Sequence, residues 1–295
     1  MNSRHALVTG ATGFVGSHLI SRLLNDGWHV SVIIRPSSTL PSYLCDDHRI
    51  SVLVDQGVKK ETRAAIIKAA PQVCFHLATY FVAQHSEDDI NSLIESNISF
   101  GTFILDALSQ INNVAFVNVG TVWQHFDGRA YSPVSLYAAT KQAFQDIIKY
   151  YAECTSLRAT TLELTDTYGP KDKRRKLLHL LIESAKTDEK LSMSAGEQIF
   201  DIIHIDDVIQ ALMIALTFAS HEAQCFAIRS NFPLNLRSFV EEVSKTLGIS
   251  IEVAWGSRPY RPREMLKTWN YTPTLPHWEP KITLQNGLQT LLKEL

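Results

Sequence analysis

The sequence predicts an α/β protein with a doubly wound parallel sheet and a smaller lobe formed mainly by its C-terminal part. Short apolar runs suited to buried strands alternate with longer segments of helical period. Each parallel return between strands needs a crossover, and helices supply it on both faces of the sheet. The expected strands are Ala6 to Thr9, Val30 to Ile34, Ser51 to Val54, Val73 to Leu77, Val114 to Val119 and Ala159 to Leu164, and the clearest helices are Phe14 to Asn25, Leu93 to Leu108 and Leu136 to Tyr151.

Composition favours a small polar ligand over a macromolecular partner. With 45% hydrophobic and 20% charged residues the chain is typical of a soluble α/β protein. Its formal net charge of −2 provides no field for nucleic acid or an anionic membrane. The four cysteines show neither disulfide nor metal spacing, and no long apolar run or cleavage signal occurs, so we expect a reducing, cytoplasmic location.

A glycine-rich turn follows the first expected strand and opens the first expected helix. Gly10 can form the tight turn, Gly13 lets the backbone approach a pyrophosphate, and Gly16 lets the helix pack closely on the sheet. The helix N-terminus also offers free N–H donors to phosphate. This arrangement predicts a Rossmann-type dinucleotide site, whose expected contacts here are Gly10, Thr12, Gly13, Phe14, Val15 and Gly16.

The end of the second strand favours NADP(H), with NAD(H) as the other possibility. An NAD-selective domain usually has an acidic residue there, whereas this chain has Arg35 followed by Ser37 and Ser38. A guanidinium with two nearby hydroxyls suits a 2′-phosphate, although Arg35 as a plain solvated charge is the alternative. Asp55, after the third strand, is expected either to accept from the adenine amine or to cap a turn.

Tyr137 and Lys141 are the candidate catalytic pair. Their spacing of four places both on one face of a helix, where the ammonium and an oxidised nicotinamide favour the phenolate of Tyr137. The tyrosine can then act as general acid or base. Thr121, at the end of the fifth strand, is expected to hydrogen-bond the substrate carbonyl, with an ordinary strand-end threonine as the alternative.

Several other features receive structural interpretations. The basic run from Lys171 to Lys176 suits a solvated helix start near the ligand phosphates, and Asp206 with Asp207 suits a helix cap. The histidines lack metal spacing, so no metal site is expected. Apolar stripes in two helices fit a homodimer face or a core; they comprise Phe100, Phe103, Leu105, Phe144, Ile147, Ile148 and Tyr151.

Together these residues resemble the extended short-chain dehydrogenase/reductase family, also described as NAD-dependent epimerases/dehydratases, over essentially the whole chain. The chain is most similar to nucleotide-sugar 4-ketoreductases of the CDP-abequose and CDP-paratose synthase type. Besides the glycine turn and the Tyr137/Lys141 pair, the resemblance rests on His76-Leu77-Ala78, Asn97, Thr167-Tyr168-Gly169-Pro170, the segments Gly196 to Asp201 and His204 to Val208, and the tail from Trp278 to Leu288.

The resemblance implies an NADPH-dependent reductase of a nucleotide-linked 4-keto-6-deoxyhexose, in deoxysugar and O-antigen biosynthesis. It implies that Tyr137 protonates the C4 oxygen while the nicotinamide delivers hydride, that Lys141 holds the nicotinamide ribose and that Thr121 orients the oxygen. Further expected cofactor contacts are Leu77, Ala78, Thr79, Asn97 and Asp166, and expected substrate contacts are Tyr80, Thr121, Trp123, Lys176 and Arg263.

The expected domains follow from these assignments. Residues 1–166 would form the NADP-binding domain, with 198–230 returning to it, and residues 167–197 and 231–295 would form the nucleotide-sugar lobe.

Departures from the family pattern bear on the substrate side of the site. The chain has Trp123-Gln124 in place of the usual Tyr-Gly, and an alignment on that pair places Val119 at the hydroxyl position. Phe200 stands where an arginine is common, so Arg263 or Lys176 would contact the pyrophosphate.

Three functions remain to be separated. No Asp-Glu pair follows Thr121, which argues against a dehydratase. Exchangeable NADPH, suggested by Arg35, favours net reduction over the runner-up, a nucleotide-sugar 4-epimerase. A non-catalytic module that senses NADP(H) is the alternative of another class.

Overall fold

The structure is a computed structural model that describes residues 4–267 and 269–291. In this part of the chain the central sheet has seven parallel strands in the order β11-β6-β5-β4-β1-β2-β3. The order reverses between β1 and β4, so the predicted doubly wound fold is confirmed. The strands are β1 (His5–Thr9), β2 (His29–Ile34), β3 (Ile50–Val54), β4 (Val73–His76), β5 (Ala115–Thr121), β6 (Arg158–Leu164) and β11 (Gln224–Ile228).

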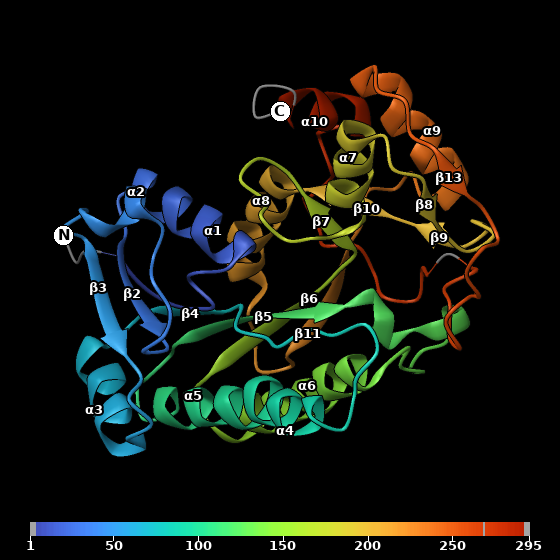
Figure 1. Cartoon of the computed structure of the whole chain (residues 1–295). Helices are drawn as coiled ribbons and strands as arrows, with labels where there is room; N and C mark the ends of the chain where they lie inside the picture. The colour runs from blue at the N-terminus through green and yellow to red at the C-terminus, as the bar shows by residue number, and fades with distance from the viewer. Residues whose placement is uncertain (1–3, 268, 292–295) are drawn as a thin grey trace.

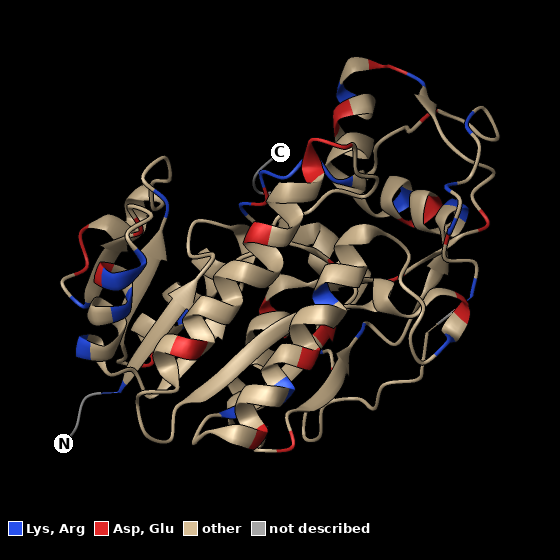
Figure 2. Cartoon of the chain, turned by 90° about the horizontal axis from the view of Figure 1, so that it is seen from below, with Lys and Arg blue, Asp and Glu red and all other residues tan. Residues whose placement is uncertain are grey.

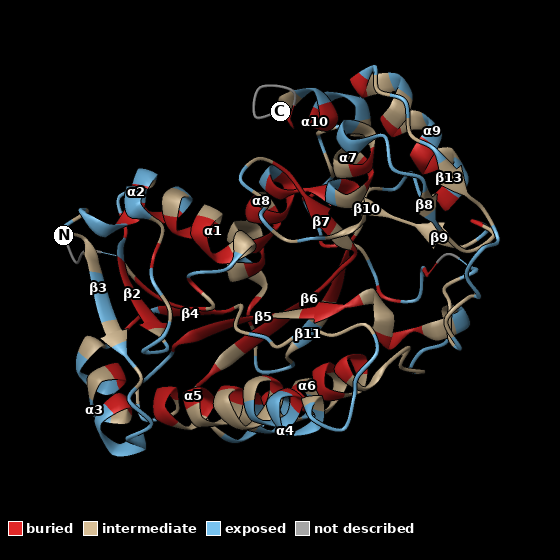
Figure 3. Ribbon diagram, viewed as in Figure 1, coloured by how far each residue is buried: buried red, intermediate tan, exposed pale blue. Residues whose placement is uncertain are grey.

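Helices cover both faces of this sheet, and each face buries its own apolar core (Figure 1). Figure 3 shows buried residues concentrated in the strands and on the helix sides that face them. One face carries α1 (Phe14–Asn25) and α8 (Ile205–Ala215), with the short α2 (Ser42–Cys45) against α1, and the other carries α3 (Lys59–Ala69), α5 (Phe100–Leu108) and α6 (Leu136–Cys154). The apolar side chains of the two stripes, for which a core or a homodimer face was expected, pack into the core beneath α5 and α6. The homodimer stays a prediction.

The helix expected from Leu93 to Leu108 begins earlier and changes its winding midway. It starts as α4 (Asp89–Ile94), passes through a π-helical turn (Glu95–Ser99) and continues as α5. A π turn inserts one residue into the helical ladder and is common at functional sites. Here it contains Asn97, whose buried side chain bonds to the loop after β4 and to α6.

The C-terminal lobe has a third apolar core, built around α7 (Leu177–Thr187), α9 (Leu236–Leu247) and α10 (Leu284–Leu291). Figure 1 shows these helices gathered beyond the carboxyl edge of the main sheet. β11 belongs to the main sheet, whereas β9 and β10 pair with strands outside it, and the division into domains stays a prediction. The short strands form three pairs in the described chain: β7 (Asp166–Tyr168) with β10 (Ile202–His204), β9 (Ile199–Phe200) with β12 (Leu234–Asn235), and β8 (Leu191–Ser192) with β13 (Val253–Ala254).

The surface carries both signs of charge. Figure 2 shows basic and acidic residues interspersed over the helices and loops, in keeping with the small net charge. Within residues 4–267 and 269–291, no helix has the length and hydropathy needed to cross a membrane. The same residues contain no group of three or more His, Cys, Asp or Glu side chains placed to hold a metal ion.

The interpretation of Asp206 and Asp207 as the cap of α8 is wrong. The cap is His204, whose Nδ1 accepts a hydrogen bond from the Asp206 N–H at 3.3 Å. The buried Asp207 carboxylate instead accepts from the backbone N–H groups of Lys281 and Ile282, both at 3.0 Å. Asp207 therefore fastens the C-terminal segment to α8, a contact 74 and 75 residues distant in sequence that a local pattern could not reveal.

Replacing Asp207 with alanine should lower the free energy of unfolding by about 2–3 kcal/mol, because two partly buried N–H groups lose a charged acceptor. The neighbouring Asp206→Ala, which removes an exposed carboxylate from the first turn of the same helix, should cost less than about 1 kcal/mol. Urea unfolding of both variants measures the difference. Equal losses would contradict the role given to Asp207.

Candidate active site

Two adjoining cavities open at the carboxyl edge of the main sheet. The sheet-edge cavity, about 710 Å³, is lined by the glycine turn, the ends of β1 to β6 and the start of α6. The lobe cavity, about 1040 Å³, is lined mainly by α7, β9, β10 and residues of the segments 261–267 and 269–270. They share a wall that includes Phe81, Trp123, Asp166 and Lys176. Ligands of doubly wound sheets bind at such an edge, where the strand order reverses.

The glycine turn brings backbone unusually close to backbone. Gly10 has φ +70°, and a Cβ there would lie 2.6 Å from the backbone of Leu77 and Ala78. A Cβ on Gly16 would lie 2.2 Å from the Gly10 carbonyl oxygen. Only glycine fits at both positions, and α1 then begins at Phe14 with no side chain capping its first N–H groups. The turn can therefore receive an anionic group directly on the backbone.

Two cations line the cavity beyond β2 and β3. Arg35 is exposed at the end of β2, and Lys59, the first residue of α3, lines the same cavity. The sequence analysis did not select Lys59, and its position after a Gly57 turn was the available signal. Asp55 accepts at Oδ1 from the Gly57 N–H at 3.1 Å and from the Thr62 hydroxyl at 3.2 Å, so this oxygen closes a turn.

Tyr137 and Lys141 lie in the first turns of α6 and both line the sheet-edge cavity. Ser135 caps the helix by accepting from the Ala138 N–H. Both functional side chains are buried, and burial lowers the pKa of Lys141 to about 8 and raises the pKa of Tyr137 well above its usual value. Burial, with a smaller contribution from Lys141, lowers the pKa of the nearby His76 to about 3, so that this histidine is neutral.

The loop after β4 packs directly against Tyr137. The Phe81 ring meets the Tyr137 ring edge-on, with centroids 4.9 Å apart. Asn97 holds this loop by accepting from the Tyr80 N–H at 2.7 Å and from the Thr79 hydroxyl at 3.0 Å. The polar atoms of Asn97 bond to the loop and to α6, and Asn97 does not line either cavity; its contact with the cofactor stays a prediction.

Thr121 ends β5 beside the sheet-edge cavity. Its hydroxyl oxygen accepts from the Trp123 N–H at 3.3 Å, which leaves its own proton free to donate. Val119 lines the same cavity and offers no hydrogen bond from its side chain. Of the two positions considered for the substrate hydroxyl contact, only Thr121 supplies a donor.

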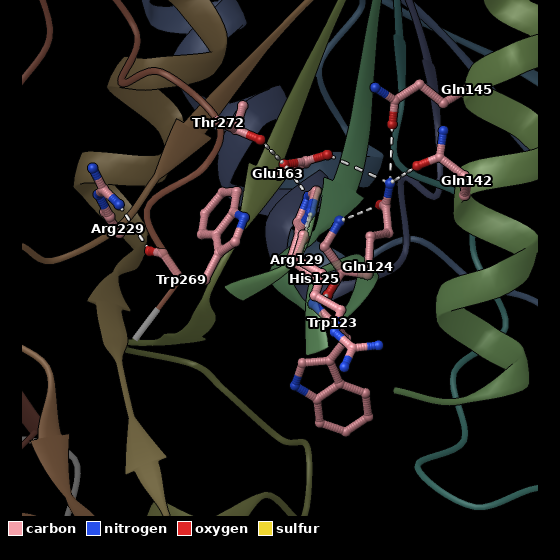
Figure 4. Close-up of polar contacts among 11 residues, drawn as sticks. Trp123, Gln124, His125, Arg129, Gln142, Gln145, Glu163, Arg229, Trp269 and Thr272 are labelled. Atoms are coloured by element: carbon pink, nitrogen blue, oxygen red, sulfur yellow. Dashed lines mark hydrogen bonds and ion pairs between the residues drawn. The ribbon is translucent and has the colours of Figure 1, made fainter. Parts of the chain in front are cut away.

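A buried polar network lies behind Thr121 (Figure 4). The Gln124 Oε1 atom accepts from the Thr121 N–H at 3.0 Å. Its Nε2 atom faces Gln142 and Gln145 of α6, at 2.9 and 3.0 Å. The same Nε2 lies 3.4 Å from Glu163 of β6. Gln124, present where the family usually has glycine, therefore joins β5, β6 and the helix that carries Tyr137.

Glu163 and His125 form a buried ion pair within this network. The two nitrogens of His125 each face an acceptor, Nε2 at 2.9 Å from Glu163 and Nδ1 at 3.1 Å from the Arg129 carbonyl. The Nδ1 atom must donate to the carbonyl, and Nε2 donates as well when Glu163 is ionised, which makes the ring an imidazolium in this ion pair. Burial opposes the charge, but the bonds to Glu163 and the backbone outweigh it and raise the pKa of His125. The Thr272 hydroxyl donates to Glu163 at 2.8 Å and Trp269 stacks on His125, which ties the C-terminal segment to the sheet.

The predicted substrate contacts differ in whether they line a cavity. Trp123 lines both cavities, as does Lys176, whose ammonium pairs with Asp166 at 2.6 Å. Tyr80 lines the sheet-edge cavity, although its hydroxyl donates to Asp89 at 2.7 Å. Arg263 lines neither cavity, because its guanidinium bonds to Ser132 and lies over the ring of Phe126.

Four arginines outside the predicted site residues line the lobe cavity, and two of them, Arg261 and Arg174, also contact aromatic rings that line the sheet-edge cavity. Arg261 is held by Glu264 at 2.6 Å and lies over the Trp123 ring. Arg174 is held by Asp172 at 2.7 Å and lies over the Phe14 ring, so it bridges the two cavities. The basic run containing Arg174 was a visible signal, whereas the choice between Arg261 and Arg263 depends on loop geometry.

Most of the predicted site residues converge, and their roles stay predictions. Of the predicted residues, Ser37, Asn97 and Arg263 do not line either cavity. Those lining the sheet-edge cavity are Gly10, Thr12, Gly13, Phe14, Val15, Gly16, Arg35, Ser38, Asp55, Leu77, Ala78, Thr79, Tyr80, Thr121, Trp123, Tyr137, Lys141, Asp166 and Lys176.

Comparisons with known proteins agree with this geometry. The model of the NAD dependent epimerase/dehydratase family matches residues 6–226. The chain is 23% identical to CDP-abequose synthase of Salmonella muenchen, over 98% of this chain and 97% of that protein. It is 25% identical to CDP-abequose synthase of Salmonella typhimurium, over 99% and 98%. UDP-glucuronic acid 4-epimerase from Bacillus cereus, solved with UDP-glucuronic acid and NAD, has the same fold, with a TM-score of 0.84, 23% identity and 98% of each chain covered.

The buried imidazolium predicts a pH-dependent contribution to stability. Because the pKa of His125 is raised on folding, its stabilisation is complete below the pKa of an unfolded histidine, about 6.5. It declines as pH rises through the raised value. The difference in unfolding free energy between wild type and His125→Gln should therefore be larger at pH 6 than at pH 8.5 in urea titrations. The exposed His29→Gln is the control, and a His125 difference that grows with pH would refute the charged state.

Proposed function

The chain belongs to the NAD-dependent epimerase/dehydratase family, enzymes of the extended short-chain dehydrogenase/reductase type, and from this premise we propose that it is an NADPH-dependent reductase of a nucleotide-linked 4-keto-6-deoxyhexose. The observation that carries the proposal is the pair of cations, Arg35 and Lys59, at the end of the sheet-edge cavity where β2 and β3 finish. These cations favour NADPH, which an enzyme binds in the reduced form and releases in the oxidised form. They therefore support net reduction of the substrate.

The cavity suits a dinucleotide with a 2′-phosphate. The backbone cradle at Gly10 and Gly16, which a Cβ would fill, leaves room for a pyrophosphate against the start of α1. Arg35 and Lys59 would face the 2′-phosphate, where a guanidinium and an ammonium favour two negative charges. An available carboxylate near Arg35 would disfavour a 2′-phosphate. One oxygen of Asp55 already accepts two hydrogen bonds within its own turn, so Asp55 opposes the phosphate less than a free carboxylate would.

Tyr137, Lys141 and Thr121 would carry the chemistry. When bound, NADPH supplies a hydride to the C4 carbonyl carbon. Tyr137 donates its proton to the C4 oxygen, and Thr121 donates a hydrogen bond to that oxygen as charge grows on it. Lys141, charged and one helical turn away, favours the phenolate that remains and holds the nicotinamide ribose.

The lobe cavity suits the nucleotide diphosphate and a deoxygenated sugar. Arg174, Arg261 and Lys176 line it and can meet the diphosphate charge, which replaces the expectation for Arg263. Phe81 and Trp123, with ring centroids 5.6 Å apart, provide an apolar wall close to Tyr137 for a C6 methyl group. The similarity to CDP-abequose synthases supports a CDP-linked sugar first, within an O-antigen type of deoxysugar pathway.

A substrate panel tests the proposal. Purified protein with NADPH and CDP-, dTDP- or GDP-linked 4-keto-6-deoxyhexoses should consume the reduced nicotinamide in proportion to the alcohol formed. Interconversion of two C4 epimers with no net loss of NADPH would instead identify a 4-epimerase. Tight NADPH binding without turnover on the panel would favour the sensing module.

Arg35→Asp should raise the KM for NADPH by about 10- to 100-fold, because a charge-assisted contact with the 2′-phosphate is replaced by repulsion. The KM for NADH should change far less. Lys60→Asp, an exposed change beside Lys59 that does not line either cavity, controls for surface charge. Parallel kinetics with both cofactors measure the ratio, and an unchanged preference would remove the argument for NADP(H).

Tyr137→Phe should reduce turnover by about 10²- to 10⁴-fold, the range supplied by a positioned general acid. Its affinity for NADPH should remain close to that of the wild type, since only one hydroxyl is lost. Fluorescence titration of the cofactor and steady-state kinetics separate the two effects. Full activity of this variant would rule out Tyr137 as the acid.

A further inference from the structure

The buried side chain of Gln124 folds back over the end of β5, into space that Gly120 leaves open. A Cβ at Gly120 would lie 3.0 Å from the Gln124 Oε1 atom. This Oε1 accepts from the Thr121 N–H at 3.0 Å, and the Thr121 hydroxyl oxygen accepts from the Trp123 N–H at 3.3 Å. The two side chains form a capping box around the 3₁₀ turn Val122–Gln124, which fixes both the backbone and the hydroxyl of Thr121.

The partners of this amide fix its orientation. Its oxygen must face the Thr121 N–H, because a reversed amide would set two donors against each other. Its nitrogen therefore points to α6, where it donates to the Oε1 atoms of Gln142 and Gln145 at 2.9 and 3.0 Å (Figure 4). Gln142 directs its own Nε2 to Asp146 at 3.4 Å, which leaves its oxygen for this bond. One side chain thus links the strand end that carries Thr121 to the helix that carries Tyr137.

Thr121 and Tyr137 come from different elements but line the same cavity. Under the proposed function both contact the C4 oxygen of the substrate, and a displacement of about 1 Å at such a site can cost about 100-fold in rate. Apolar packing between a strand and a helix has no preferred direction, whereas hydrogen bonds constrain distance and angle. A hydrogen-bonded link between β5 and α6 can therefore hold the two donors in register.

We propose that Gln124 is a positioning residue, which holds the Thr121 hydroxyl in place relative to Tyr137 through its hydrogen bonds to β5 and α6. The inference rests on the proposed function, in which Thr121 and Tyr137 act on one carbonyl oxygen. Gln124 lines neither cavity, so its effect on the reaction passes through Thr121.

Gln124→Met, which keeps the length of the side chain and removes the amide, should lower kcat by about 10- to 100-fold, because the Thr121 donor is displaced from the oxygen on which charge develops. The KM values for NADPH and for the keto sugar should stay within about threefold, since no ligand contact is lost. Gln142→Met removes one acceptor of the same link at a half-buried position and should lower kcat about threefold. Steady-state kinetics measure both constants.

The matched control is Gln72→Met. The Gln72 Oε1 atom also accepts from the backbone N–H of a central strand, that of His5 at 3.1 Å, but at the opposite edge of the sheet. Its loss should leave kcat unchanged. Wild-type kcat in Gln124→Met, or a raised KM with unchanged kcat, would overturn the proposal.

A double-mutant cycle tests whether Gln124 acts through Thr121. Thr121→Val removes the hydroxyl that is positioned, so Gln124→Met should lower kcat by less than about threefold in that background. The same loss of kcat in both backgrounds would show that Gln124 acts by another route and would refute its role.

Amide hydrogen exchange provides a readout that needs no substrate. The Thr121 N–H loses its acceptor in Gln124→Met, so peptides covering residues 119–124 should exchange about tenfold faster than in wild type or Gln72→Met. Unchanged exchange in peptides from β1 and β4 shows that the variant is folded. Equal exchange at 119–124 would refute the hold of Gln124 on Thr121, whereas absence of turnover by the wild type would refute the proposed function.

Discussion

The arrangement of the site depends on one constraint of parallel sheets, that all strands end at the same edge and each must return by a crossover. In this protein the crossovers that leave the two strands at the β1/β4 boundary, α1 after β1 and α4 with α5 after β4, lie on opposite faces, which leaves an opening at the carboxyl edge. Several segments that supply candidate functional residues follow one of these strand ends. The glycine turn follows β1, Arg35 follows β2, Thr79 follows β4, Thr121 closes β5 and Asp166 lies two residues after β6. Residues far apart in the sequence therefore meet at one edge of the sheet.

The same constraint explains which parts of the site the sequence could predict. Positions at strand ends, such as Gly10, Arg35 and Thr121, follow from locating the strands, and the Tyr137/Lys141 pair follows from helical spacing. Contacts set by side-chain direction in loops do not follow, which is why Arg261 reaches the lobe cavity and Arg263 does not. The π turn at Asn97 and the Asp207 contact with the C-terminal segment lack a local signal, because each is stabilised by partners far away in the chain. Lys59 was missed for a different reason, since a lysine at the start of a helix is ordinary until the fold shows that it lines the same cavity as Arg35.

The buried charged side chains lie in two regions, one that supports the site and one that lines it. Behind β5 His125 and Glu163 form an ion pair that is hydrogen-bonded to Gln124 and Thr272, which suits a rigid support for Thr121 and α6. In front of β5, Lys141 is buried without a carboxylate partner in the described contacts, and the adjacent His76 stays neutral. Lys141 and Tyr137 line the same cavity, so under the proposed function this uncompensated ammonium would act on the Tyr137 oxygen. Because these two regions are separate, the network of His125 and Glu163 can be stable while Lys141 remains without a carboxylate partner among the described residues of the cavity.

The environment of Tyr137 also bears on the direction of the reaction. Burial raises its pKa, and the Asp166 carboxylate adds to this effect even though Lys176 pairs with it at 2.6 Å. Before substrate reacts, the phenol therefore holds its proton firmly, which is the state a reductase needs at the start of its cycle. An enzyme that began by oxidising its substrate would need the phenolate first and would have to overcome the same burial. Lys141, one helical turn away on α6, would favour the phenolate only as negative charge develops on the tyrosine oxygen, because an ammonium interacts more strongly with an anion than with a neutral hydroxyl. Under the proposed function, Tyr137 would therefore release its proton during hydride delivery rather than abstract one beforehand.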